Sequence, residues 1–475
     1  MTPALLVSAA HKSSGKTTVT LALAAALAAR GHVVQPFKKG PDYIDPMWLS
    51  LAAGRPCINL DPHLMGWDEI AEVFAQRLRG AGIGLVEGNK GLHDGLALDG
   101  SNSNAALARH LGLPVLLVLD ARGMTRGIAP LILGYQAFDP SIRIGGVILN
   151  QVGGPRHEGK LRAVIEHYTD VPVLGAVPKD ARLSLDERHL GLMPDRELGD
   201  APARVREMGE LIAGCVDLER VRDLAATRCH ADVVEPIADA TLRAAAEPLR
   251  IGIARDKAFG FYYPDDLDAL VAEGAELVPF DTLADRQLPP ALDGVFIGGG
   301  FPELFMAELE ANVLLRGAMH RAIAEGLPVY AECGGLMYLA RSITWKGRSA
   351  QMVGAIPGDV VMHARPVGRG YVRVEETAEF PWQDAEHEPS IRHGHEFHHS
   401  SLENLDPSVA FAYRVQRGHG IDGLHDGVMV HNVLASYAHL RHTGGNDWPK
   451  RFAAHLRRVR GEARAAQAPR LRIGG

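Results

Sequence analysis

Residues 331–335 read Ala331-Glu332-Cys333-Gly334-Gly335 and stand between two apolar runs, residues 327–330 and 336–339. An apolar run, a few small residues and a second apolar run predict a strand, a sharp turn and a helix, with a thiol at the turn. Small residues on both sides of a nucleophile let the backbone adopt a strained turn that exposes the side chain. Cys333 is therefore a candidate nucleophile, although a cysteine at a strand end is more often a small buried apolar residue.

Length and composition describe an ordinary globular protein. At roughly 150 residues per domain, 475 residues predict two or three domains. The net charge of −7 gives no electrostatic reason to expect nucleic acid or an anionic membrane as a partner. No apolar run is long enough to span a bilayer, nothing resembles a signal peptide, and the four cysteines show no paired spacing. We therefore expect a cytoplasmic protein with neither nucleic acid nor membrane as a partner.

A phosphate-binding loop is predicted near the N-terminus. An apolar run at residues 4–9 leads into Ala-His-Lys-Ser-Ser-Gly-Lys-Thr-Thr at residues 10–18, and apolar residues then recur at helical spacing up to Gly31. In such a strand–loop–helix unit, backbone N–H groups surround the phosphates, Lys16 reaches the terminal ones and the Thr17 hydroxyl can bind Mg²⁺. Ala10 replaces the usual first glycine, and a surface turn is the alternative. The flanking strand and helix favour phosphate binding.

Charged loops follow the next predicted strands. Residues 38–46, after the strand at 33–37, read Lys-Lys-Gly-Pro-Asp-Tyr-Ile-Asp-Pro, at the strand end where open parallel sheets bind ligands. A solvated turn is the alternative. Glu87 follows a strand at 83–86 and could hold Mg²⁺ opposite Thr17. Strands at 115–119, 146–149 and 173–177 alternate with helical stretches, which predicts a doubly wound parallel sheet up to about residue 195.

The second half of the chain predicts another α/β unit. Residues 196–247 are charged and alanine-rich, with apolar residues at helical spacing, and predict a helical connector. A strand at 294–297 then runs into Gly298-Gly299-Gly300, whose N–H groups can stabilise an oxyanion if the loop lies beside Cys333. A flexible turn is the alternative. His439 is the best candidate base for Cys333. The histidines at 393–399 alternate as in a half-exposed strand, so we interpret them as structural or substrate-contacting rather than metal ligands.

Taken in order, the motifs resemble the cobyrinic acid a,c-diamide synthase family, from near residue 4 to about residue 442. They are Ser-Gly-Lys-Thr-Thr at 14–18, the loop at 37–46, Val-Glu-Gly at 86–88, Gly-Gly-Gly-Phe-Pro-Glu at 298–303, Ala-Glu-Cys-Gly-Gly at 331–335, Gly-His-Glu-Phe-His at 394–398 and Ala-Ser-Tyr-Ala-His at 435–439. This family includes hydrogenobyrinic acid a,c-diamide synthases and related sirohaem amidases.

The resemblance implies a two-domain α/β fold. It joins a phosphate-loop domain with a doubly wound parallel sheet, similar to dethiobiotin synthetase, to an α/β domain of the class I glutamine amidotransferase type. We expect the ATP-binding synthetase domain at 1–195, the helical connector at 196–247, the amidotransferase domain at 248–460 and a disordered tail at 461–475.

The resemblance also implies roles for individual residues. The expected ATP contacts are Gly15, Lys16, Thr17, Thr18, Lys38 and Asn150, the last of these on adenine. The substrate carboxylate is expected beside Asp42, Tyr43 and Asp45, and Mg²⁺ is expected on Thr17, Asp45 and Glu87. In the other domain Cys333 would be the nucleophile, His439 its partner, and the oxyanion hole would be formed by Gly299, Gly300 and Gly334. Ordinary triad amidotransferases carry Glu two positions after the histidine. That position is Arg441 here, so we expect a Cys–His dyad without an identified third residue.

The implied reaction is ATP- and glutamine-dependent amidation of the a and c acetate carboxylates of cobyrinate or hydrogenobyrinate through an acyl phosphate. The same chemistry on sirohaem ranks second, because relatives that act on it share the same machinery. An alternative of another class is a phosphate-loop ATPase switch with a non-catalytic docking domain, and the Cys333 turn together with His439 argues against it. Glutamine and a tetrapyrrole carboxylate are the expected partners. The number of amidated carboxylates, the ammonia route and the oligomeric state, a homodimer included, are left open.

Overall fold

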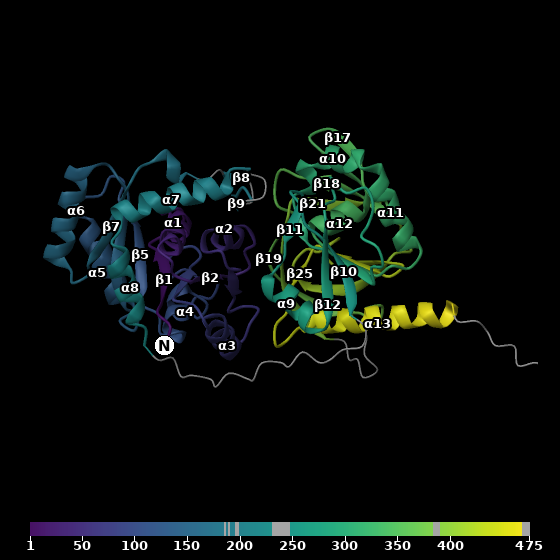
Figure 1. Ribbon diagram of the computed structural model, residues 1–475, viewed down its shortest axis with the longest axis horizontal. Coiled ribbons are helices and arrows are strands. Elements are labelled where there is room, and N and C mark those ends of the chain that lie inside the picture. Colours follow the sequence, from purple (N-terminus) through teal and green to yellow (C-terminus); the bar gives the residue numbers. More distant parts are fainter. Residues whose placement is uncertain (185–186, 189–190, 195–198, 230–247, 383–389, 468–475) are drawn as a thin grey trace, which may run out of the picture. The chain divides into compact units, whose positions relative to one another are not determined.

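The computed structural model describes residues 1–184, 187–188, 191–194, 199–229, 248–382 and 390–467. The chain forms two compact units, Met1–Ile237 and Ala238–Gly475, which Figure 1 draws in sequence colours. Each unit has its own sheets and its own apolar core, and each is described by itself.

The first unit is organised around a seven-stranded sheet whose neighbouring strands are all parallel. The strands are short apolar runs buried along nearly their whole length, as expected when helices cover both faces of a sheet. Their order, β3-β2-β4-β1-β5-β6-β7, confirms the doubly wound sheet predicted from the sequence. The strands are β1 (Ala4–Ala9), β2 (Val34–Lys39), β3 (Ile58–Leu60), β4 (Ile83–Glu87), β5 (Val115–Asp120), β6 (Ile144–Val152) and β7 (Val173–Pro178), and a separate short pair is formed by β8 (Glu187–Arg188) and β9 (Gly191–Leu192).

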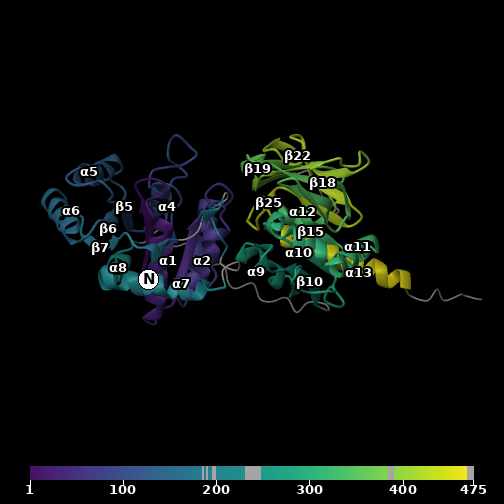
Figure 2. The same cartoon turned by 90° about the horizontal axis from the view of Figure 1, so that it is seen from above.

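Helices lie over both faces of this sheet. Figure 2 shows α4 and α5 over one face and α1, α7 and α8 over the other. The α1 helix contacts both α2 and α7, and Gly209 of α7 lies so close that an added Cβ would be 3.0 Å from the Cβ of Ala25. The helices are α1 (Lys16–Ala29), α2 (Ile44–Ala53), α3 (Trp67–Arg77), α4 (Asn104–His110), α5 (Ile128–Phe138), α6 (Pro155–Tyr168), α7 (Ala201–Cys215) and α8 (Leu218–Ala226), with the 3₁₀ turn η1 (Ala181–Leu183).

The structure corrects the separate helical connector predicted for residues 196–247. Its described part is helical, but α7 packs against α1 and α8 contacts β1, so both helices belong to the first unit. Asp217 separates the two helices, because its side chain accepts the backbone N–H of Arg220 and begins α8 anew. The first unit therefore extends past residue 195. Residues 230–247 lie outside the described residues.

The second unit contains a ten-stranded mixed sheet in the order β12-β10-β13-β15-β24-β23-β22-β19-β20-β25. The first five strands are parallel to one another and the remaining pairs are antiparallel. A four-stranded sheet, β17-β16-β18-β21, and the pair β11-β14 complete it. The strands are β10 (Leu249–Ala254), β11 (Phe259–Phe261), β12 (Ala275–Phe280), β13 (Gly294–Ile297), β14 (Gly299–Gly300), β15 (Val329–Glu332), β16 (Ala340–Trp345), β17 (Arg348–Gln351), β18 (Ile356–Met362), β19 (Gly368–Glu376), β20 (Ile391–His398), β21 (Ser400–Glu403), β22 (Ala410–Arg417), β23 (His425–Val430), β24 (Val433–Ser436) and β25 (His439–Leu440).

The helices of the second unit include one that corrects the predicted tail. The last helix, α13, reaches Gln467, so residues 461–467 are helical where disorder was expected, and residues 468–475 lie outside the described residues. Of the described helices, none combines the length and the apolar character needed to cross a bilayer. The helices are α9 (Pro264–Ala272), α10 (Met306–Ala311), α11 (Val313–Ala324), α12 (Gly334–Leu339) and α13 (Trp448–Gln467), with the 3₁₀ turn η3 (Pro302–Leu304).

Two candidate active sites

The predicted phosphate loop lies between β1 and the N-terminus of α1. Gly15 precedes the helix with φ 85° and ψ 19°, and among the described residues no side chain caps its N-terminus. An added Cβ at Gly15 would lie 2.1 Å from Asn150 Nδ2, so no larger residue fits there. The backbone N–H groups of the first turn, Lys16 to Thr18, are thus presented at a helix end with positive potential. This arrangement suits a phosphate group.

Asn150 supports this loop from the end of β6. Its Nδ2 donates a hydrogen bond of 2.9 Å to the carbonyl oxygen of Ser14, and the residue is buried. The hydroxyl of Tyr135 donates to the carbonyl of Ala10 at the other end of the loop. These contacts fix the loop. The contact of Asn150 with adenine stays a prediction.

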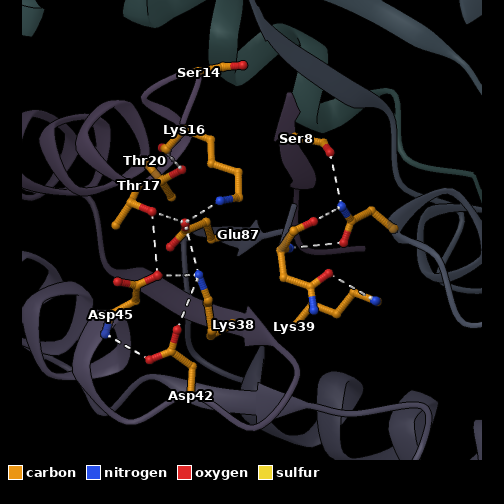
Figure 3. Close-up of polar contacts among 12 residues, drawn as sticks. Ser8, Ser14, Lys16, Thr17, Thr20, Lys38, Lys39, Asp42, Asp45 and Glu87 are labelled. Atoms are coloured by element: carbon orange, nitrogen blue, oxygen red, sulfur yellow. Dashed lines mark hydrogen bonds and ion pairs between the residues drawn. The ribbon is translucent and has the colours of Figure 1, made fainter. Parts of the chain in front are cut away.

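Six of the predicted residues meet at the carboxyl ends of β2 and β4 (Figure 3). Lys38 Nζ lies 2.5 Å from Asp45 Oδ2, 3.0 Å from Glu87 Oε1 and 3.8 Å from Asp42 Oδ2. The Thr17 hydroxyl donates to Glu87 Oε1 at 2.5 Å, and Lys16 Nζ lies 3.9 Å from the same oxygen. Side chains from α1, β2, α2 and β4 therefore form one charged cluster, which we call the Lys38 cluster: Lys16, Thr17, Lys38, Asp42, Asp45 and Glu87.

Electrostatics distinguish the two lysines of the Lys38 cluster. Burial by itself lowers the pKa of Lys38, but the charges of Asp45 and Glu87 outweigh it and raise that pKa well above its usual value. Burial and the charge of Lys38 lower the pKa of Lys16. Lys38 is thus committed to the carboxylates. Within the described residues, the ion pair of Lys16 is the long contact of 3.9 Å with Glu87, so Lys16 is the lysine of this cluster better able to approach a phosphate.

The loop before α2 places the remaining predicted residues. Asp42 Oδ1 accepts the backbone N–H groups of Ile44 and Asp45, at 2.9 and 3.1 Å, and so begins the helix and orients Asp45. Tyr43 is buried at the same helix start, and Thr18 lies partly exposed in the first turn of α1. The structure therefore gives Asp42 a clear positioning contact. The predicted contacts of Tyr43 and Thr18 with substrate and ATP stay predictions.

The oxygen ligands predicted for Mg²⁺ fit that ion. Glu87 Oε2 is buried and, among the described residues, has no hydrogen-bond partner, so one carboxylate oxygen is available. Thr17 and Asp45 add a hydroxyl and a second carboxylate, which are the hard donors that Mg²⁺ prefers. In the described part of the chain no group of three or more His, Cys, Asp or Glu side chains could hold a metal by itself. An ion here would complete its shell with phosphate oxygens and water.

Cys333 occupies a strained turn in the second unit. It connects β15 to α12 with φ 47° and ψ −98°, a region that residues other than glycine rarely adopt. Its N–H donates to the carbonyl of Ser436 at 2.7 Å, which ties the turn to β24. The strand, sharp turn and helix predicted around Cys333 are present. The strain is of the kind that a nucleophile turn requires.

His439 lies beside this turn, on β25. Its Nδ1 is 3.4 Å from Glu332 Oε2, and its ring stacks on that of His395 with centroids 4.9 Å apart. Burial alone lowers the pKa of His439, but hydrogen bonds to Cys333 and Glu332 raise that pKa to about 10. The structure thus brings the two residues of the predicted dyad together, with the imidazole protonated at neutral pH.

The predicted oxyanion glycines surround the same point. An added Cβ at Gly334 would lie 2.9 Å from the backbone nitrogen of Gly300, and one at Gly299 would lie 2.7 Å from His439 Cε1. The glycine loop therefore lies beside Cys333, which was the condition set for its oxyanion role. The role itself stays a prediction.

Sequence reasoning missed Glu332. The sequence signal that could have identified it is a carboxylate in the last position of an otherwise apolar strand, next to the candidate nucleophile. In the structure this carboxylate is buried. Arg441, at the position where triad enzymes carry Glu, is buried and donates from Nε and Nη2 to Asp265 at 3.0 and 2.7 Å. That position therefore serves a buried ion pair. His398 of the histidine cluster stacks on Tyr437 and contacts the carbonyl of Ser400.

The class of protein is a nucleotide-binding domain joined to a glutamine amidotransferase domain. Residues 6–192 match the family described as the CobQ/CobB/MinD/ParA nucleotide binding domain, and residues 250–447 match the CobB/CobQ-like glutamine amidotransferase domain.

Curated relatives narrow this class further. The chain is 46% identical to cobyrinate a,c-diamide synthase of Magnetococcus marinus, over 97% of this chain and 98% of that protein. It is 42% identical to the protein of that name from Methanosarcina acetivorans, over 98% and 97%. The Listeria monocytogenes protein is 39% identical, over 92% and 95%. The chain belongs to the cobyrinic acid a,c-diamide synthase family, and it is a ligase that forms carbon–nitrogen bonds with glutamine as the nitrogen donor.

Proposed function

We propose that the enzyme amidates the a and c acetate carboxylates of cobyrinate, or of its cobalt-free form hydrogenobyrinate, through an acyl phosphate. The observation that carries this proposal is the Lys38 cluster, where a phosphate loop and two carboxylate-bearing loops meet at one edge of the sheet. The curated names of relatives that match nearly the whole chain support the choice of substrate.

Glutamine hydrolysis is assigned to the second unit. The Cys333 thiolate attacks the side-chain amide carbon of glutamine, and the N–H groups of the glycine loop and of Gly334 stabilise the oxyanion. The protonated His439 gives its proton to the departing nitrogen, which leaves as ammonia. The imidazole, now neutral, then takes a proton from water as the water oxygen attacks the thioester carbon. Glutamate and the Cys333 thiolate are released, which restores the thiolate–imidazolium pair.

Carboxylate activation is assigned to the first unit. A carboxylate is a poor electrophile, so one of its oxygens first attacks the γ-phosphate of ATP and releases ADP. Lys16 neutralises charge on the phosphates while Lys38 holds Asp45 and Glu87 in place. Ammonia then attacks the acyl carbon and phosphate leaves. A Mg²⁺ ion held by Thr17, Asp45 and Glu87 would supply further neutralisation of phosphate charge.

Mass spectrometry of the product tests the proposal. Purified enzyme with glutamine and Mg-ATP should add two amide groups to cobyrinate, each at the cost of one ATP. Substrate labelled with ¹⁸O in its carboxylates should pass one label per amide to inorganic phosphate. If phosphate carries no label, the acyl phosphate is wrong. If no amide forms on cobyrinate or hydrogenobyrinate, the substrate assignment is wrong, and amidation of sirohaem in a parallel reaction would identify the second-ranked substrate.

A further inference from the structure

Glu332 contacts the candidate catalytic histidine from the residue next to the nucleophile. We propose that Glu332 is the residue that orients His439, in the role that a carboxylate two positions after the histidine has in triad amidotransferases. The inference deepens the function proposed for the second unit and rests on it. Glu332 is therefore a positioning residue, which acts on the reaction through His439.

Both carboxylate oxygens of Glu332 have defined partners. Oε2 lies 3.4 Å from His439 Nδ1, while Oε1 accepts the backbone N–H of Leu440 at 2.9 Å and the hydroxyl of Tyr330 at 2.6 Å. The side chain is 2% exposed. A buried carboxylate held by two donors has little freedom, so the imidazole that it contacts is held as well.

These contacts join strands that lie far apart in the sheet order. Glu332 ends β15, which is next to β24, whereas His439 begins β25, which pairs only with β20 within the described sheet. The bond from Leu440 N to Glu332 thus fixes β25 against the end of β15. It fixes the histidine relative to the turn that carries Cys333.

Other groups around His439 are less suited to this role. Arg441 is paired with Asp265 and carries the wrong charge. His395 stacks on the imidazole, and burial together with the charges of His439 and Arg441 holds its pKa well below its usual value. His395 is therefore neutral and cannot balance an imidazolium. Glu332 supplies the negative charge that the other two lack.

The carboxylate has a specific effect on the proton of the imidazole. With Nδ1–H directed at Glu332, the other ring nitrogen, Nε2, is left for the hydrogen bond between His439 and Cys333, where it takes up or returns the thiol proton. The Glu332 carboxylate beside Nδ1 favours the imidazolium form of His439. A glutamine at this position would keep an acceptor for Leu440 and Tyr330, but its NH₂ group would face Nδ1 and favour the wrong tautomer.

The test compares Glu332→Gln with wild type in glutamine hydrolysis. We expect kcat for glutamine hydrolysis to fall about 100-fold or more, while KM for glutamine changes little. The corresponding Asp→Asn change in a Ser–His–Asp triad lowers kcat by about 10⁴-fold. Ammonia-supported synthesis should be unaffected. Glu276→Gln, an exposed glutamate on β12, is the matched control and should behave as wild type.

The pH dependence of Cys333 alkylation separates positioning from a merely structural role. Without the Glu332 charge the pKa of His439 falls, so the imidazolium that stabilises the Cys333 thiolate is less populated. Iodoacetamide should therefore modify Cys333 in the folded variant at least about tenfold more slowly at pH 7. The extent of modification is measured by mass spectrometry on the peptide that contains Cys333, after digestion of the protein. Among the described residues, the charged or titratable groups recorded around this imidazole include Cys333, Glu332, His395 and Arg441.

Each outcome gives a decision. If wild type does not hydrolyse glutamine, the proposed function fails. If wild type does so and Glu332→Gln keeps hydrolysis within threefold, or keeps the alkylation profile, the inference is overturned. If circular dichroism shows that Glu332→Gln is unfolded, Glu332→Asp decides: its shorter charged side chain should give an intermediate alkylation profile, and a wild-type profile would overturn the inference.

Discussion

Single buried charges determine how the first site is built. Lys38 is 2% exposed and Glu87 is fully buried, and a buried charge is costly unless it is paired, so the contact of 3.0 Å between them compensates both. Lys38 is held by carboxylates, whereas Lys16 makes a longer contact with Glu87. The proposed function therefore gives the phosphate to Lys16, because the nearest charges of the two lysines differ.

Lys38→Met should destabilise the protein in a way that depends on pH. Removal of the cation leaves the buried Glu87 and the partly buried Asp45 without their nearest positive charge, and breaking a buried ion pair typically costs about 3–5 kcal/mol. The pKa of Asp45, which Lys38 now lowers, rises in the variant. The loss in free energy of unfolding should therefore be largest near pH 7 and shrink as the pH falls and the carboxylates take up protons.

Urea unfolding at pH 7 and pH 5 measures this effect. Lys160→Met, an exposed lysine in α6, is the control and should change the unfolding free energy by less than about 0.5 kcal/mol. A Lys38→Met protein as stable as wild type at both pH values would show that the carboxylates do not need this lysine.

Gly299→Ala should impair glutamine use with little effect on ammonia use. The added Cβ would lie 2.7 Å from His439 Cε1, and the stacked ring of His395 and the contact with Glu332 leave the imidazole little room to move. A displacement of about 1 Å can cost on the order of 100-fold in rate. Assays with glutamine and with ammonia measure the two activities. Gly317→Ala in α11, where the nearest atom is 3.4 Å away on a flexible arginine, should lose neither.

At the level of elements, the sequence predicted the helices and strands that have a clear pattern of apolar residues. Such a pattern is present in the strands around residues 83–87 and 115–120 and in the helix after the phosphate loop. β3 has only three residues, too few for a period to be recognised. Glu332 was missed because its contact with His439 depends on the pairing of β25 with β20, which no local pattern reports.

The short connection between β24 and β25 is held by one buried carboxylate, Asp426. This carboxylate accepts hydrogen bonds from the backbone N–H groups of Tyr437 and Ala438, at 3.0 and 2.9 Å, and so fixes the backbone that precedes His439. Burial raises the pKa of Asp426 to about 6, against the effect of these hydrogen bonds. The folded state therefore holds this proton more tightly than the unfolded chain, whose value is near 4.

Asp426→Asn should remove a pH dependence of stability. Below about pH 4 the carboxyl is neutral in both states, and above about pH 6 it is charged in both. As the pH rises between these values, wild type should lose about 3 kcal/mol of unfolding free energy relative to the variant, whose side chain does not titrate. Urea unfolding of both proteins from pH 4 to pH 7 measures the difference. A constant difference would mean that Asp426 titrates normally in the fold.

In the whole molecule, the two half-reactions are proposed for units with separate cores. The phosphate loop and the Lys38 cluster lie entirely within Met1–Ile237, and the Cys333 turn, the glycine loop and His439 lie entirely within Ala238–Gly475. No described residue of one unit is needed to complete the contacts given for the site of the other. Damage to one site should therefore leave the chemistry of the other measurable.

Cys333→Ala and Lys16→Ala should separate the two half-reactions. Cys333→Ala removes the nucleophile but no contact of the Lys38 cluster, so synthesis should stop with glutamine and continue with ammonia. Lys16→Ala should reduce synthesis from either nitrogen source by about 100-fold or more, because a transition-state charge loses its partner, while a glutamine analogue should still alkylate Cys333. Both variants are made in a Cys229→Ala background, because Cys229 is exposed and would also react. Loss of ammonia-supported synthesis in Cys333→Ala would mean that this cysteine also supports the ATP site, and the assignment of one half-reaction to each unit would then be wrong.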